Sequence, residues 1–346
     1  MSIEIPAQPQ KRYLEIDFLR GSAVFLMLVA HINFVFTKNY NFILDTLTWF
    51  GATICFSVFI FCFAFSYGLK LSDNKKLNLK KETKRFFRLL FVYYGSAFCA
   101  QYFIFSNISI EKLYLILTFQ YLPVFTEFII PFFLYVILIL IFFPVFKKLL
   151  KYPILFISIS LAIYFFGQWL YPLDGGGNFL NVIKTLLVGN GDVHAFGVLS
   201  YLPIFVLGLI VGESQSDKKG ELAVVVIFVT AVILFAFLKI LGFSVWHRFP
   251  PSVLFLLYGV IYSFGVLLLY RYLKKIIPLD KFFIFLSKKT LFIFFISILI
   301  ILGSSNLLNK AKFESTTVWL IHFLIIAGIS LLSYSYGKLV EILEKR

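Results

Sequence analysis

Three ionisable residues near the start of the chain fall on one face of a predicted helix. Asp17 and Arg20 lie three residues apart, and Arg20 and His31 lie eleven residues apart. At 3.6 residues per turn, eleven residues correspond to about 1100° of rotation, so the three side chains share one stripe, with His31 about 16 Å beyond Arg20. An imidazole has an unperturbed pKa of about 6.5, which suits proton transfer. The stripe therefore predicts an acid–base site. The alternative is an anchoring ion pair below a histidine that packs between helices.

A second group of candidate residues is a basic ridge. Lys81, Lys84, Arg85 and Arg88 are spaced by three, one and three residues, so they share one side of a helix. A guanidinium matches two phosphate oxygens at once. The ridge predicts a binding site for a phosphate-bearing molecule. A basic flank that contacts lipid headgroups is the alternative.

The elements that must position these groups are membrane helices. Of 346 residues, 60% are hydrophobic and only 14% are charged, with a mean hydropathy of +0.93. A soluble domain has about 25% charged residues, so the composition excludes soluble, disordered and disulfide-rich classes. We expect an all-α polytopic bundle that forms one domain over residues 1–346, with residues 1–17 and 337–346 as polar ends. The three cysteines lie in apolar runs without a CxxC motif, so no metal or disulfide site is predicted.

About ten segments are long enough to cross the bilayer, which requires roughly 17–25 residues. The predicted spans are 18–38, 47–69, 89–108, 128–147, 153–171, 197–213, 221–241, 252–271, 287–304 and 316–336. Most of the 32 basic residues fall between spans on the side of the N-terminus. This bias predicts that both termini are cytoplasmic. It also explains the net charge of +15 without a nucleic-acid partner.

The two groups together resemble the membrane acyltransferase-3 superfamily, which includes polysaccharide O-acetyltransferases. That family has an arginine, ten residues and a histidine on its first span, matched here by Arg20 and His31 within IDFLRGSAVFLMLVAH. Its basic-x-x-basic motif at the third span is matched by Arg85 and Arg88. The segment RFPPSVLFLLYG at 248–259 is similar to one in this family and in the related heparan-glucosaminide acetyltransferase-like proteins. A histidine of the family's late span is replaced by Ser297.

The resemblance implies transfer of an acyl group, commonly acetyl, from acyl-CoA on the cytoplasmic side. The acceptor would be a hydroxyl of a cell-envelope glycan or glycolipid, and the location a bacterial cytoplasmic membrane. In this interpretation His31 is the general base, with Arg20 and Asp17 completing the catalytic group. A covalent acyl-histidine is the other open route. The basic ridge at 81–88 would bind the phosphates of acetyl-CoA.

Two further residues are candidates for binding the acceptor. Glu127 begins the fourth predicted span, and His322 lies about two turns into the tenth; Asp192 and His194, in a predicted outer loop, are weaker candidates. An exporter or flippase of a lipid-linked glycan is the alternative function, and a structural subunit of an envelope complex is a third. The arginine–histidine register combined with the basic ridge favours the transferase, since an exporter does not need both. The oligomeric state is left open.

Overall fold

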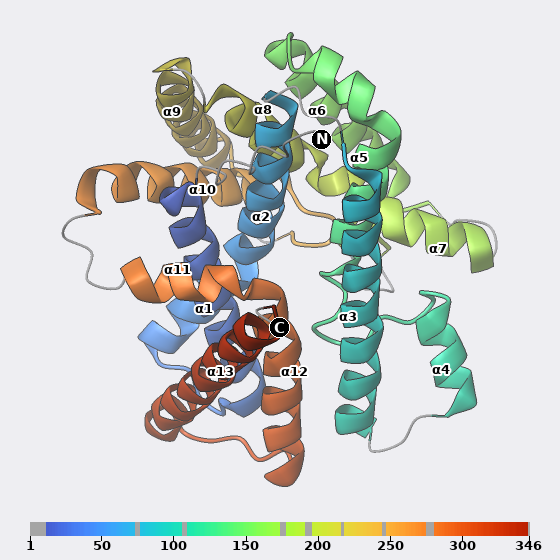
Figure 1. Ribbon diagram of the computed structural model, residues 1–346, viewed down its shortest axis with the longest axis vertical. Coiled ribbons are helices and arrows are strands. Elements are labelled where there is room, and N and C mark those ends of the chain that lie inside the picture. The colour runs from blue at the N-terminus through green and yellow to red at the C-terminus, as the bar shows by residue number, and fades with distance from the viewer. Residues whose placement is uncertain are drawn as a thin grey trace, which may run out of the picture.

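The protein is built almost entirely from α-helices. The computed structural model describes residues 12–72, 77–105, 109–173, 178–190, 196–215, 218–243, 247–274 and 280–344. Within these ranges there are thirteen α-helices, and β-pairing is limited to two isolated bridges (Figure 1). A helix satisfies its own backbone hydrogen bonds, which hydrocarbon requires. The expectation of an all-α polytopic membrane protein is confirmed.

Eight of the helices are long and apolar enough to cross a membrane, namely α1, α2, α5, α6, α9, α10, α12 and α13. The bounds are α1 (Leu14–Phe36), α2 (Phe42–Ser72), α3 (Leu79–Phe105), α4 (Ile110–Leu117), α5 (Ile130–Leu149), α6 (Pro153–Leu170), α7 (Asn178–Leu187), α8 (Leu202–Ser214), α9 (Lys218–Ile240), α10 (Val253–Leu273), α11 (Asp280–Lys288), α12 (Thr290–Leu307) and α13 (Ser315–Glu344), with a short 3-10 helix, η1, at Leu199–Tyr201.

The other two predicted spans correspond to helices of a different character. The span predicted at 89–108 belongs to α3, which begins ten residues earlier and carries the basic ridge in its first turns. The span predicted at 197–213 is divided into η1 and α8, and Leu199–Ser214 together is short for a crossing. A proline at 203 limits how far the α8 helix extends towards its N-terminus.

Helix α2 is the centre of the bundle and packs against α8, α1 and α10. Gly208 and Gly212 lie one turn apart on α8 and face α2. A Cβ added at Gly212 would lie 2.3 Å from the carbonyl oxygen of Phe65, so only glycine permits this approach. Small residues allow membrane helices to pack backbone to backbone in this way. The contact fixes the aromatic face of α2, which includes Phe59 and Phe63.

Helix α1 is held on several sides. Figure 1 shows two groups of helices. In the first group α11, α12 and α13 lie beside α1, and in the second α5, α6 and α8 lie near the end of α2 that leads into α3. Helix α3 contacts both α12 and α5 and so connects the two groups. In the apolar stretch of α9 only 11% of the residues are buried, and in that of α13 only 22%. Such exposure is expected for helices that face lipid. The space between α1, α2, α3, α12 and the start of α5 contains the candidate site.

Candidate functional site

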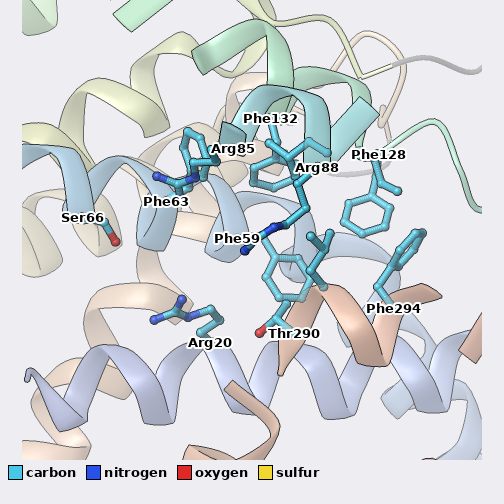
Figure 2. A pocket seen from close by; sticks show the side chains of 13 residues that line it. Arg20, Phe59, Phe63, Ser66, Arg85, Arg88, Phe128, Phe132, Thr290 and Phe294 are labelled. Carbon is cyan, nitrogen blue, oxygen red and sulfur yellow. The ribbon is translucent and has the colours of Figure 1, made fainter. Parts of the chain in front are cut away.

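Three arginines from two helices meet at a cavity of ≈ 200 Å³, here called the basic cavity. Arg20 comes from α1, and Arg85 and Arg88 come from α3. Figure 2 shows the side chain of Arg20 reaching from α1 towards the space that the two α3 arginines also border. The remaining walls are mainly phenylalanine rings from α2, α12 and the start of α5. The structure thus brings together basic residues that belong to separate sequence motifs.

Asp17 holds Arg20 in place. The carboxylate is buried, and its Oδ1 lies 3.0 Å from Nη2 of Arg20 and accepts a 2.9 Å hydrogen bond from Ser287. Its Oδ2 lies 2.5 Å from Nε of Arg12. Asp17 does not line the basic cavity. Its position indicates that it orients Arg20, whereas the sequence prediction grouped it with the catalytic residues.

A buried carboxylate in the first turn of α3 holds Arg85. Glu82 accepts hydrogen bonds from the hydroxyl of Tyr67 and from Nζ of Lys70, the latter at 2.5 Å, and lies 3.9 Å from Nη1 of Arg85. The guanidinium of Arg85 also lies over the ring of Phe63, 4.3 Å from its centroid. Burial acts to raise the pKa of Glu82, but the hydrogen bonds from Lys70 and Tyr67 and the nearby cations outweigh it, so the pKa lies below its ordinary value.

The basic ridge predicted from the sequence divides in the structure. Arg85 and Arg88 border the basic cavity, whereas Lys81 and Lys84 do not. The side chains of Lys81 and Lys84 are exposed at the start of α3. Only the second half of the ridge is therefore placed to contact a molecule in the cavity.

His31 lies at a second, larger space of ≈ 590 Å³, here called the His31 cavity. Glu127 and Arg248 line the same cavity. Each of the three has a buried polar atom without a hydrogen-bond partner among the described residues: Nδ1 of His31, Oε2 of Glu127 and Nε of Arg248. Buried polar atoms are nearly always hydrogen-bonded, so three such atoms at one cavity leave positions that water or a bound ligand can fill.

The loop before α5 places an aromatic ring against His31. The ring centroids of Phe125 and His31 lie 4.1 Å apart, tilted by 35°. The backbone of Phe125 has φ 69°, the left-handed region, which costs a residue with a Cβ about 1–2 kcal/mol. Hydrogen bonds from the backbone and side chain of Thr126 to Pro123, at 3.1 and 2.6 Å, hold this turn. Strained backbone of this kind is typical of functional sites.

One pair of rings separates the two cavities. Phe59 of α2 and Phe128 of the loop before α5 line both the basic cavity and the His31 cavity. Their ring centroids are 6.1 Å apart and the rings are tilted by 31°. Phe128 also packs edge-on against Phe294 of α12, with centroids 4.3 Å apart. The cationic and imidazole ends of the site are therefore neighbours across an aromatic partition.

Arg248 was not among the candidates drawn from the sequence. Its guanidinium lies 4.9 Å from the ring centroid of Phe196. The loop that carries it is fixed from α6, where the hydroxyl of Tyr164 and the side-chain amide of Gln168 donate to the carbonyl of Pro251 at 2.7 and 3.2 Å. The signal in the sequence was the RFPPS segment, which begins with this arginine.

Glu127 and His322, predicted together as acceptor-binding residues, have different positions. Glu127 lines the His31 cavity, whereas His322 lines neither cavity. The ring nitrogens of His322 lie 2.7 Å from the carbonyl of Val318 and 3.4 Å from that of Val29, so the side chain connects α13 to α1.

Three residues that the sequence analysis raised remain, namely Asp192, His194 and Ser297. Asp192 and His194 lie outside the described residues. Ser297, which replaces the family's late histidine, is buried and donates to the carbonyl of Phe294 at 2.7 Å. Among the described residues, no cluster of three or more His, Cys, Asp or Glu could hold a metal ion.

A comparison of the chain with known protein families gives one match. The family model described as heparan-alpha-glucosaminide N-acetyltransferase, catalytic, matches residues 12–221. This range contains α1–α8 and with them His31, the basic cavity's arginines and Glu127, but not Arg248. No curated protein and no solved structure matches the chain.

Proposed function

This chain belongs to the heparan-alpha-glucosaminide N-acetyltransferase catalytic family, and from that premise we propose that it transfers an acetyl group from acetyl-CoA to an amino or hydroxyl group of a glycan or glycolipid. The observation that carries the proposal is the pair of cavities with a common aromatic wall, arginines in one and an imidazole in the other. The resemblance to acyltransferase-3 proteins remains a prediction, as does the choice of a hydroxyl acceptor.

The basic cavity suits the donor. Coenzyme A combines several phosphates with a long, thin pantetheine arm that ends in the thioester. Arg85 and Arg88 would bind the phosphates through charge-assisted hydrogen bonds, with Arg20 on the opposite side. The arm would then extend towards Phe59 and Phe128, beyond which the His31 cavity begins. The predicted topology puts the basic cavity on the cytoplasmic side, where acetyl-CoA is made.

The His31 cavity suits the acceptor and the chemical step. The unpartnered Nδ1 of His31 would accept the proton of the acceptor's amino or hydroxyl group as that group attacks the thioester carbonyl. The carbon–sulfur bond then breaks, and the departing CoA thiolate receives the proton from the imidazolium. A route through acetyl-histidine uses the same groups in two steps, with His31 as the nucleophile.

The test uses purified protein and radiolabelled acetyl-CoA. We expect saturable binding and transfer of label to glucosamine, whose free amine matches the family name, or to N-acetylglucosamine, which offers only hydroxyls. Comparing the two acceptors decides between nitrogen and oxygen acetylation. Acetyl-CoA that neither binds nor loses its acetyl group in the presence of envelope glycans would overturn the proposal and favour an exporter.

A further inference from the structure

Glu127 is the only carboxylate of the described residues that lines either cavity. Its side chain is half-buried, and its Oε2 atom is buried without a hydrogen-bond partner among those residues. The other titratable side chains at the His31 cavity are those of His31, Cys55, Tyr121 and Arg248. An ordinary thiol, phenol or guanidinium keeps its proton at neutral pH. His31 and Glu127 are therefore the two side chains of this cavity that can accept a proton from a bound molecule.

The turn that carries Glu127 also contacts the imidazole and borders the donor cavity. Two residues before Glu127, the ring of Phe125 packs on His31, with the ring centroids 4.1 Å apart. One residue after Glu127, Phe128 lines both cavities. The hydrogen bonds of Thr126 described above hold this turn. The carboxylate is thus fixed before binding at the end of the His31 cavity that adjoins the basic cavity, which lowers the entropy lost when it pairs with a ligand.

The surroundings of Glu127 suit it to proton transfer. Glu127 lies before the first residue of α5, outside the membrane-spanning helix. Burial raises the pKa of its carboxyl to about 7, although the backbone amides of residues 125–127 and the charge of Arg248 act in the opposite direction. A group whose pKa lies near the operating pH can both take up and release a proton, which is the property of an efficient acid–base residue.

An amino acceptor has two protons to lose when it is acetylated. An aliphatic amine is largely protonated at neutral pH, and an ammonium nitrogen has no lone pair with which to attack a thioester. One proton must therefore leave before the attack, and a second leaves as the nitrogen–carbon bond forms. His31 takes up only one of them, which it then passes to the CoA thiolate. A hydroxyl acceptor loses a single proton in the whole reaction, so it needs one base rather than two.

We propose that Glu127 binds the protonated amino group of the acceptor and takes the first of its two protons. The freed nitrogen then attacks the thioester carbonyl while its second proton moves to His31. The carbon–sulfur bond breaks, the imidazolium protonates the thiolate, and Glu127 releases its proton to water. The inference rests on the proposed function and deepens it, because it assigns to Glu127 the preference for a nitrogen over an oxygen acceptor.

The first experiment measures binding without turnover, as protection of the detergent-solubilised protein against thermal unfolding in the absence of acetyl-CoA. Glucosamine is compared with glucose, which has a hydroxyl group in place of the amine. In the unmodified chain we expect glucosamine to bind roughly 10- to 100-fold more tightly, the range for a hydrogen bond between charged groups. Glu127→Gln should remove this preference. Glu314→Gln is the matched control, since it removes a carboxylate that is 58% exposed and paired with Lys38, and the preference should survive in it.

The second experiment isolates the first proton. Ethylamine and methoxyamine have nearly the same shape, but at neutral pH ethylamine is an ammonium ion and methoxyamine is already a neutral nucleophile. Transfer of label from acetyl-CoA to each amine gives kcat/KM. Glu127→Gln should slow transfer to ethylamine by roughly 10²–10⁴-fold, the contribution of a positioned base, and transfer to methoxyamine by far less. A residue that only supports the fold would slow both amines equally.

The outcomes separate this inference from the proposed function. Equal losses for the two amines in Glu127→Gln, or glucosamine that protects the unmodified chain no better than glucose, overturns the role of Glu127. If Glu127→Gln does not fold, Glu127→Asp, which withdraws the carboxylate by one methylene, should slow ethylamine more than methoxyamine, and equal slowing overturns the role. Transfer to the hydroxyls of N-acetylglucosamine but to no amine overturns it while the acetyltransferase stands. Glucosamine-selective protection without transfer from acetyl-CoA to any acceptor refutes the acetyltransferase and leaves the ammonium site standing.

Discussion

Replacing the four residues of the basic ridge one at a time should divide them into two classes. The spacing of Lys81, Lys84, Arg85 and Arg88 predicts one phosphate-binding surface. In the structure only the two arginines border the basic cavity. We therefore predict that Arg85→Gln and Arg88→Gln weaken acetyl-CoA binding. Lys81→Gln and Lys84→Gln should leave it nearly unchanged, although every variant removes one positive charge from the same helix.

The size of the difference follows from the contacts. A hydrogen bond to a charged group is worth about 1.5–3 kcal/mol, which corresponds to roughly 10- to 150-fold in Kd. The side chain of Arg85 is 34% exposed and already lies near Glu82, so solvent screening puts its contribution at the lower end, about tenfold. Arg88 is exposed like the two lysines but borders the cavity, so we expect a similar contribution from it. The lysines lie outside the cavity and act only through screened long-range charge, so we expect less than about fivefold for either.

The assay is equilibrium binding of radiolabelled acetyl-CoA at constant ionic strength, with S-acetylpantetheine as a second ligand. S-acetylpantetheine has the same thioester arm but no phosphate, so its affinity should be equal in all four variants. Lysine variants as weak as the arginine variants would place the phosphates outside the basic cavity. Arginine variants that bind acetyl-CoA normally would refute the cavity as the donor site altogether.

Three other changes test separate parts of the structure. Phe128→Ala opens the partition between the cavities. It should raise acceptor-independent hydrolysis of acetyl-CoA, measured as released thiol, because water then reaches the thioester. Unchanged hydrolysis would mean that the Phe128 ring does not separate the two cavities. Gly212→Val overpacks the contact between α8 and α2 and should cost about 1–3 kcal/mol or more of stability in thermal unfolding; a variant of normal stability would contradict that contact. Glu82→Gln should be less stable than the unmodified chain at neutral pH. Because the pKa of Glu82 is lowered on folding, this difference should shrink as the pH falls below about 4.5 and through the folded-state pKa; a difference independent of pH would show that ionised Glu82 contributes nothing.

The local parts of the site could be predicted from the sequence. Helical register placed Asp17, Arg20 and His31 on one stripe and the ridge on one face, because side-chain direction in a helix is set by spacing alone. Apolar run length predicted where most spans lie, since the bilayer fixes the length of a crossing. The structure adds that Arg20 of α1 and Arg85 of α3 border one cavity.

The parts that depend on contacts between distant segments were not predictable. Whether Lys84 or Arg88 reaches the cavity depends on the rotation of α3 against α12 and α5, which spacing does not specify. Arg248 lies 217 residues after His31 in a loop, and only the fold brings both to one cavity. For His322 the sequence predicted a functional role, because an ionisable residue within a span is rare. In the structure both of its ring nitrogens lie near backbone carbonyls, which join α13 to α1.

A single turnover by His31→Gln loaded with radiolabelled acetyl-CoA tests whether the imidazole carries out the chemical step. We predict that this variant binds acetyl-CoA as tightly as the unmodified chain, because His31 lies outside the basic cavity. Acetyl transfer should slow by roughly 10²–10⁴-fold, the contribution of a positioned general base. Transfer at an undiminished rate, or loss of acetyl-CoA binding with the imidazole, would contradict it.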